Sequence, residues 1–219
     1  MEMRTNFHKR LREIQDDVLA MGSMVEKANS QAIDALKGRD LDLARKVISD
    51  DPKVNRRRFE IEEKCIQLIA TQQPMAGDLR AIICVLNIIT EMERIADHAQ
   101  GIAKIVIMIG DEPPLKPLID IPRMADKVND MLRRSLDAFI ARDADAARQI
   151  TAEDDEVDEL YNQVFRELLS FMIEDPRTIT RATRLIWVAH NLERSADRVT
   201  NICERVIYLV TGKMEEIDT

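Results

Sequence analysis

Apolar residues recur at helical spacing along most of the chain. Intervals of three, four and seven residues place them on one face of a helix. This pattern predicts three long helices in each half: residues 6–37, 41–72 and from 78 onward, then 122–141, 144–174 and 179–211. Glycines at 38 and 212 suit helix ends, and Asp78 is the expected N-cap of the third helix.

A proline-rich segment divides the two halves. The sequence GDEPPLKPLIDIP, residues 110–122, contains four of the seven prolines, and proline removes backbone donors and interrupts helices. We therefore expect a first three-helix unit at residues 1–110, a linker at 111–121 and a second unit at 122–219. Pro52 falls inside the second predicted helix, where it would distort the helix locally or mark a late start.

The two halves repeat each other. ALKGRDLDLAR at residues 35–45 matches AFIARDADAAR at 138–148, and the pattern Glu-Arg-x-Ala-Asp occurs at 93–97 and again at 193–197. Two matches in the same order indicate an internal duplication. The predicted fold is all-α, with two tandem antiparallel three-helix bundles.

Composition and charge argue against one class of binding partner and favour one cellular compartment. The chain is 45% apolar, only 4% aromatic, and carries a formal charge of −8, which argues against nucleic acid as a partner. The one dense basic run, residues 56–58, is interpreted as a solvated helix face. Three isolated cysteines and a charged amino terminus favour a reducing cytoplasm, and no apolar stretch approaches the length of a membrane span.

The repeated acidic pairs are the candidate functional residues. Side chains four residues apart share a helix face, and two like charges there are mildly unfavourable unless something offsets them. The second helix of each unit adds oxygen-bearing side chains that an antiparallel bundle brings to the same level. Such hard oxygen donors suit magnesium, calcium, manganese or iron. The candidate ligands are Asp51, Asn55, Glu93 and Asp97 in the first unit, and Asp154, Asp158, Glu193 and Asp197 in the second.

Other residues offer weaker signals. His190 shares a face with Glu193 and Asp197 and would supply a nitrogen ligand, or else is an ordinary surface or half-buried histidine. His98 is expected at the surface, and Trp187 in the core or at a bundle contact. Without a nucleophile motif or a phosphate-binding glycine loop, no catalytic residue is predicted and the chain is not expected to be an enzyme.

Four segments in order resemble the PhoU family of phosphate-transport regulators: DDPKVN, TQQPMAGDLR, EMERIADHAQGIAKI and NLERSADRVTNI. The resemblance covers nearly the whole chain. It implies a cytoplasmic homodimer that acts as a negative regulator of phosphate uptake and phosphate-starvation signalling. The implied partners are the ATPase of the phosphate ABC transporter and a phosphate-sensing histidine kinase, so that any membrane contact is made through partner proteins.

The resemblance also implies metal ions at the acidic motifs of the third helices and at the second-helix pair Asp154 and Asp158. The pair Asp51 and Asn55 matches less well, because an asparagine replaces the second acid, so the first site is expected to be weaker. Iron, zinc, magnesium and manganese all stay open.

Two other interpretations are open. The first is a carboxylate-bridged di-metal oxidoreductase, although such bundles use Glu-x-x-His motifs and this chain has only the reversed order, His190-x-x-Glu193. The second is a purely structural bundle whose acids are solvated, as the acidic residues at the start of a helix often are.

Overall fold

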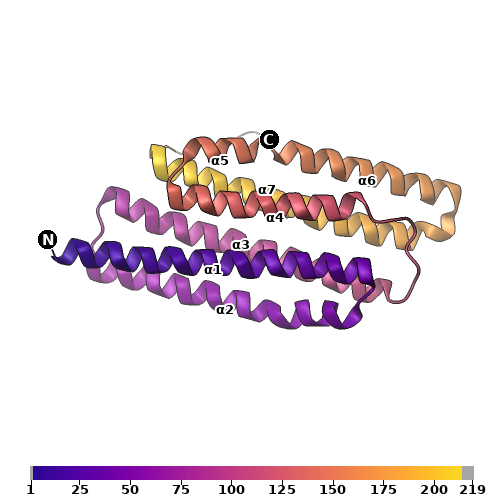
Figure 1. The fold of residues 1–219 in the computed structure, drawn as a ribbon, viewed down its shortest axis with the longest axis horizontal. Coiled ribbons are helices and arrows are strands. Elements are labelled where there is room, and N and C mark those ends of the chain that lie inside the picture. The colour runs from indigo at the N-terminus through magenta and orange to yellow at the C-terminus, as the bar shows by residue number, and fades with distance from the viewer. Residues whose placement is uncertain (1, 214–219) are drawn as a thin grey trace.

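The structure is a computed structural model that describes residues 2–213, with side chains described from residue 6. No strand occurs within residues 2–213. Two sets of helices lie side by side along the long axis of the molecule (Figure 1). The first set is α1 (Glu2–Gly38), α2 (Leu41–Gln72) and α3 (Ala76–Ile109); the second is α4 (Asp120–Ala141), α5 (Ala144–Thr151), α6 (Asp154–Glu174), a 3₁₀ turn η1 (Pro176–Thr178) and α7 (Ile179–Thr211). The predicted all-α duplication is confirmed.

Each unit turns from its first to its second helix through the same Arg-Asp pair. Arg39 and Arg142 both adopt a left-handed backbone conformation, with φ of 53° and 54°. The following aspartates, Asp40 and Asp143, each accept hydrogen bonds from two backbone N–H groups of the next helix. These caps satisfy donors that a helix start leaves unpaired, which is why the matched sequences give matched turns.

The two units meet through two antiparallel helix pairs. Between α1 and α4, Asn29 Nδ2 donates to Asn129 Oδ1 over 2.9 Å, and Asn129 Nδ2 donates to Ser30 Oγ. Between α3 and α7, Arg198 Nη1 lies 3.4 Å from Glu91 Oε2, and His98 Nδ1 lies 3.4 Å from Asn191 Oδ1. Helices α3 and α7 are therefore shared between their own bundle and the interface.

The core is aliphatic and continuous across both units. Helix α3 buries residues around most of its circumference, as expected for a helix packed on several sides. Helix α2 instead buries one stripe at helical spacing, formed by Val47, Val54, Ile61, Cys65 and Leu68. All three cysteines are free and buried. Within residues 2–213, no helix is long and apolar enough to cross a membrane.

Three sequence predictions about the helices need correction. The predicted helix 144–174 is two helices, α5 and α6, separated at Ala152 and Glu153. Asp78 lies in the first turn of α3 and does not cap it; Met75 occupies the N-cap position without a side-chain hydrogen bond. Pro52 lies inside an unbroken α2, so it marks no late start.

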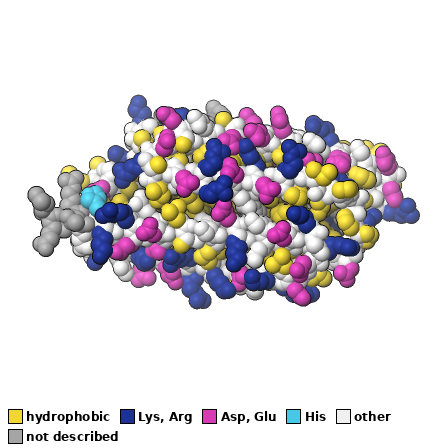
Figure 2. Space-filling view, in the orientation of Figure 1, with side chains coloured by type: hydrophobic (Ala, Val, Ile, Leu, Met, Phe, Trp, Pro, Cys, Tyr) yellow, Lys and Arg dark blue, Asp and Glu magenta, His cyan; other side chains and the backbone are white. Residues whose placement is uncertain are grey.

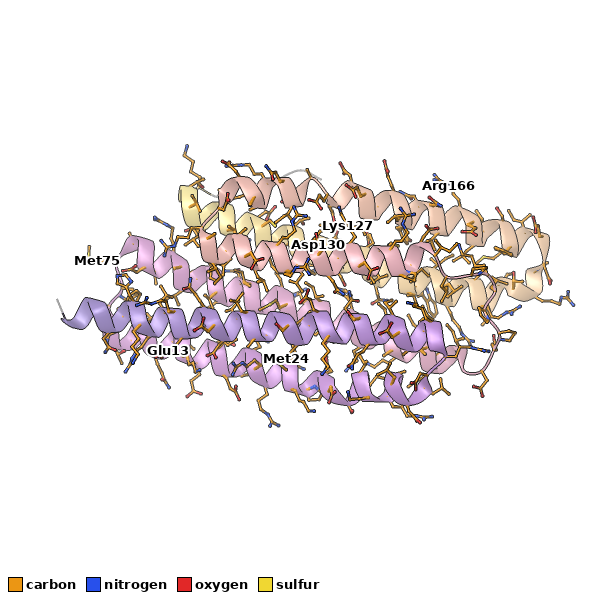
Figure 3. All side chains as sticks on the ribbon, in the orientation of Figure 1. Glu13, Met24, Met75, Lys127, Asp130 and Arg166 are labelled. Atoms are coloured by element: carbon orange, nitrogen blue, oxygen red, sulfur yellow. The ribbon has the colours of Figure 1, made fainter. Side chains whose placement is uncertain are left out.

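Ion pairs with residues of α4 stabilise the break between α5 and α6. Glu153 accepts from Arg134 at 2.7 Å and from Lys127 at 2.6 Å, and Lys127 also reaches Glu156 at 2.9 Å. Figure 3 places Lys127 and Asp130 on α4 near this break. Because these partners lie 19 to 29 residues apart in sequence, helical periodicity alone does not reveal the break.

Gly22 allows α1 and α4 to approach closely. A Cβ added at this glycine would lie 2.3 Å from Leu136 Cδ1. We expect Gly22→Leu to lower the free energy of unfolding by about 1–3 kcal/mol, because overpacking forces neighbouring side chains or helices apart. Chemical denaturation measures this loss, and adding Leu136→Ala should recover part of it. Gly77→Leu is the control, since its Cβ would meet only Arg80 Nη2, at an ordinary contact distance of 3.9 Å; equal losses at both glycines would contradict the close approach.

Candidate metal centres

The second unit brings its four predicted carboxylates into one cluster, here called the repeat-two cluster: Asp154, Asp158, Glu193 and Asp197. Asp154 is the first residue of α6 and Asp158 lies one turn further, while the other two come from the middle of α7. The Asp154 side chain is only 3% exposed, and its Oδ1 has no hydrogen-bond partner. A buried carboxylate oxygen without a donor is costly, and a bound cation would relieve that cost.

Mutual repulsion is evident in the pKa values of the repeat-two cluster. Burial, together with the charges of Asp158, Asp197 and Glu193, raises the pKa of Asp154 to about 7. Burial and the charge of Asp197 also raise the pKa values of Asp158 and Glu193. Burial disfavours the charged form and like charges add to the effect, so the cluster is electrostatically strained without a cation.

Nearby groups compensate part of this charge. His190 Nδ1 lies 3.2 Å from Glu193 Oε2, and Arg194 Nη1 lies 3.3 Å from Asp197 Oδ2. The exposed His190 ring packs near Tyr161, with centroids 6.1 Å apart. The histidine is thus placed beside the cluster, as its spacing from Glu193 predicted.

The first unit forms a related group, here called the repeat-one cluster: Asp51, Asn55, Glu93 and Asp97. Asp51 on α2 is 9% exposed, and its Oδ1 and the Asn55 Oδ1 both lack hydrogen-bond partners. Burial raises the pKa of Asp51, with additional contributions from the charges of Asp97 and Glu93 on α3. The three carboxylates therefore lie near one another, and Asn55 lies one helical turn beyond Asp51.

An arginine enters the repeat-one cluster that the sequence analysis missed. Arg58 Nη1 lies 3.5 Å from Glu93 Oε2, and Arg58 Nη2 lies 3.4 Å from Glu62 Oε2. Arg57 pairs with Asp17 at 2.7 Å. The interpretation of residues 56–58 as a solvated face is therefore wrong for two of the three. Arg58 follows Asp51 by seven residues and so shares its face, a spacing that could have signalled the contact.

The structure also corrects the predicted surface position of His98 and the core alternative for Trp187. His98 is half-buried between α3 and α7, and burial lowers its pKa. Trp187 is 49% exposed, so it is not a core residue. Acidic and basic side chains are interspersed over the face seen in Figure 2.

The oxygen atoms of both clusters are ligands that suit a hard cation, but the side chains stand too far apart to hold one ion. Buried, unpartnered oxygens of Asp51 and Asp154 are the kind of ligand that magnesium, manganese or iron prefers. Within the described part of the chain, no three Asp, Glu, His or Cys side chains already stand close enough to hold one ion. Binding would therefore require the carboxylates of α6 and α7, or of α2 and α3, to draw together.

Comparison with known proteins identifies the class. The family model described as the PhoU domain matches twice, at residues 18–106 and 121–206. Together the two matches cover well over half of the chain, which therefore belongs to the PhoU family.

Individual relatives extend over almost the full chain. A phosphate-specific transport system accessory protein PhoU homolog from Clostridium acetobutylicum is 40% identical over 213 residues, 97% of both chains. The Escherichia coli accessory protein PhoU is 37% identical, covering 94% of this chain and 86% of its own. The crystal structure of PhoU from Pseudomonas aeruginosa superposes with a TM-score of 0.89 at 37% identity, covering 94% of this chain and all of that one.

Proposed function

We propose that this chain is an accessory protein of phosphate-specific transport that restrains phosphate uptake and phosphate-starvation signalling when phosphate is plentiful. The observation that carries the proposal is the double PhoU domain, together with relatives described as phosphate-transport accessory proteins that align over 94–97% of the chain. The fold supports a binding role, because two long bundles offer extended helical surfaces to partner proteins.

The proposed partners are the ATPase of the phosphate ABC transporter and a phosphate-sensing histidine kinase. The relatives' description as accessory to the transport system supports the first partner. In this proposal the chain works in the cytoplasm as a homodimer, and reaches the membrane only through those proteins. It transmits the state of the transporter to the kinase by binding and performs no chemistry of its own.

Metal binding is a separate part of the proposal. The repeat-two cluster is the better candidate, since four carboxylates approach one another and Asp154 contributes a buried oxygen without a donor. Asp154, Asp158, Glu193 and Asp197 would hold the ion, and Asp51, Asn55, Glu93 and Asp97 would form the weaker counterpart. A bound cation would neutralise the cluster and fix α6 against α7. Oxygen donors favour iron, manganese or magnesium over zinc.

The alternative is a di-metal oxidoreductase. Such enzymes draw Glu and Glu-x-x-His ligands from four helices into a bundle core, whereas each cluster here draws on two helices, and His190 precedes Glu193 in the reversed order. We expect iron-loaded protein to consume no oxygen beyond a free-iron control in the presence of a reductant. Multiple turnovers per chain would favour the oxidoreductase.

Direct binding tests the adaptor proposal. Purified full-length protein is titrated against the ATPase of the phosphate transporter and against the cytoplasmic part of the phosphate-sensing kinase, with the ATPase of an unrelated ABC transporter as the control. We expect saturable binding to both phosphate-system proteins and none to the control. Binding to neither, with correctly folded components, would contradict the proposal.

A further inference from the structure

The two acidic clusters differ at equivalent positions of the repeat, and one of these differences replaces a cation by an aromatic ring. In the second helices, Asp51 corresponds to Asp154 and Asn55 to Asp158 at the same spacing, which makes Tyr161 the counterpart of Arg58. In the third helices, Glu93 and Asp97 correspond to Glu193 and Asp197. At this position of the second helix, the repeat-one cluster has a cation and the repeat-two cluster has an aromatic ring.

The guanidinium of Arg58 is directed at the acids. Its side chain is 24% exposed, with Nη1 3.5 Å from Glu93 Oε2, Nη2 3.4 Å from Glu62 Oε2, and Cζ 5.1 Å from the centre of the Phe59 ring. Both terminal nitrogens of the guanidinium thus face carboxylates, while its Nε is buried without a hydrogen-bond partner. Arginine stays charged in proteins and presents several donors to carboxylates, so it satisfies an anionic cluster permanently.

Tyr161 brings no such charge to the repeat-two cluster. Its ring lies against those of His190 and Phe165, with centroids 6.1 and 6.4 Å apart. A second nearby position differs in charge in the same direction. The positive charge of Lys104 opposes the burial that raises the pKa of Asp51, and the residue equivalent to Lys104 in the second unit is the acidic Glu204. Three carboxylates and the Arg58 guanidinium give the repeat-one cluster a formal charge of −2, whereas four carboxylates and the Arg194 guanidinium beside Asp197 leave the repeat-two cluster at −3.

We propose that Arg58 occupies the place of a metal ion in repeat one, so that this chain binds a divalent cation at the repeat-two cluster alone. The inference rests on the proposed metal binding at repeat two, and it replaces the weaker metal site proposed for repeat one by a cluster that Arg58 occupies. A cation approaching Glu93 has to displace the guanidinium, whereas one approaching Glu193 and Asp154 relieves repulsion. Repeat one is then a permanently closed cluster, and only repeat two responds to the metal concentration.

The test is a Mn²⁺ titration of metal-stripped, full-length protein, followed by electron paramagnetic resonance of the free ion. We expect one ion per chain. Arg58→Met should bind a second ion, with affinity at repeat one raised about tenfold or more by removal of the opposing charge. Tyr161→Arg, which places the same cation in repeat two, should bind none. Arg58→Lys keeps the charge and should stay at one.

Control variants and fold measurements distinguish the loss of the metal site from the loss of the folded structure. Arg56→Met alters the exposed neighbour of the same run and should leave one ion per chain, and helicity and thermal unfolding are checked for every variant. Asp154→Asn should abolish binding to the wild-type site, whereas Asp51→Asn should not. Two ions of similar affinity in the wild-type chain would overturn the inference while leaving metal binding intact. No binding in any variant would overturn the metal proposal and the inference together.

Discussion

Asp154→Asn is expected to stabilise the metal-free protein and to remove its response to Mn²⁺. The wild-type carboxylate is buried, lacks a partner at Oδ1, and faces three other acids. Asparagine keeps the shape, removes the charge, and offers an amide that can donate to the neighbouring carboxylates. We expect a gain of about 1–2 kcal/mol in the free energy of unfolding near pH 8, because an uncompensated buried charge is lost.

The stability that Asp154→Asn gains over the wild-type protein should increase as the pH rises. The pKa of Asp154 is raised from its ordinary value near 3.8 to about 7. The folded state therefore holds this proton more tightly than the unfolded chain does. The contribution of Asp154 to wild-type stability is thus largest below pH 4 and is lost as the pH rises to about 7. Asp154→Asn should flatten that part of the profile, and the difference between the two proteins should vanish toward pH 4.

Mn²⁺ should affect the two proteins differently. At a concentration 100 times its dissociation constant, a ligand that binds only the folded state adds about 2.7 kcal/mol, and the wild-type protein should show such a gain while Asp154→Asn shows none. Asp155→Asn is the matched control, because Asp155 is the exposed neighbour on the same helix turn. If Asp154→Asn is less stable than wild type at pH 8, or still gains stability from Mn²⁺, the strained-cluster account is wrong.

The two sequence halves are expected not to fold alone. Fragments 1–110 and 111–219 should each be largely unfolded or aggregated, and mixing them should restore a helical 1:1 complex. The reason is the shared core: Cys84 of α3 donates to the backbone carbonyl of Arg205 in α7, and Gly22 of α1 packs against Leu136 of α4. Separation would expose apolar faces of α1, α3, α4 and α7 to water.

Circular dichroism and gel filtration measure this directly. The full chain should unfold in one cooperative transition, since the interface between units is built from the same buried side chains as each bundle. A loop nick at residues 111–119 that leaves both pieces present is the control, and should preserve the fold. Two compact, cooperatively unfolding fragments would instead show that the predicted division at 111–121 separates independent domains.

Local sequence signals predicted most of the helices. Helices 41–72 and 179–211 were predicted with the bounds that the structure has, because apolar spacing and flanking breakers are properties of the segment itself. The break at Ala152 and Glu153 was missed because Arg134 and Lys127 of α4 stabilise it, and periodicity within one helix carries no information about a distant ion pair. The N-cap of α3 was misplaced because Asp78 is a good capping residue in general, while this helix begins two residues earlier.

The sequence also predicted only part of the two acidic clusters. Four-residue spacing on a duplicated helix correctly grouped Glu193 with Asp197, and the antiparallel arrangement correctly brought Asp154 near them. The role of Arg58 could not be derived in this way, since it depends on the distance between α2 and α3. His98 was misplaced because the α3–α7 contact between units, and not its own bundle, buries it.

The regulatory role is decided by phosphate-starvation gene output in phosphate-rich medium after deletion of the gene for this chain. We expect output near the phosphate-starved level, and its return to the repressed level when the wild-type gene is restored. Repressed output in the deletion strain, persisting when every other PhoU-family gene of the cell is also deleted, would contradict the claim that this protein restrains the phosphate response.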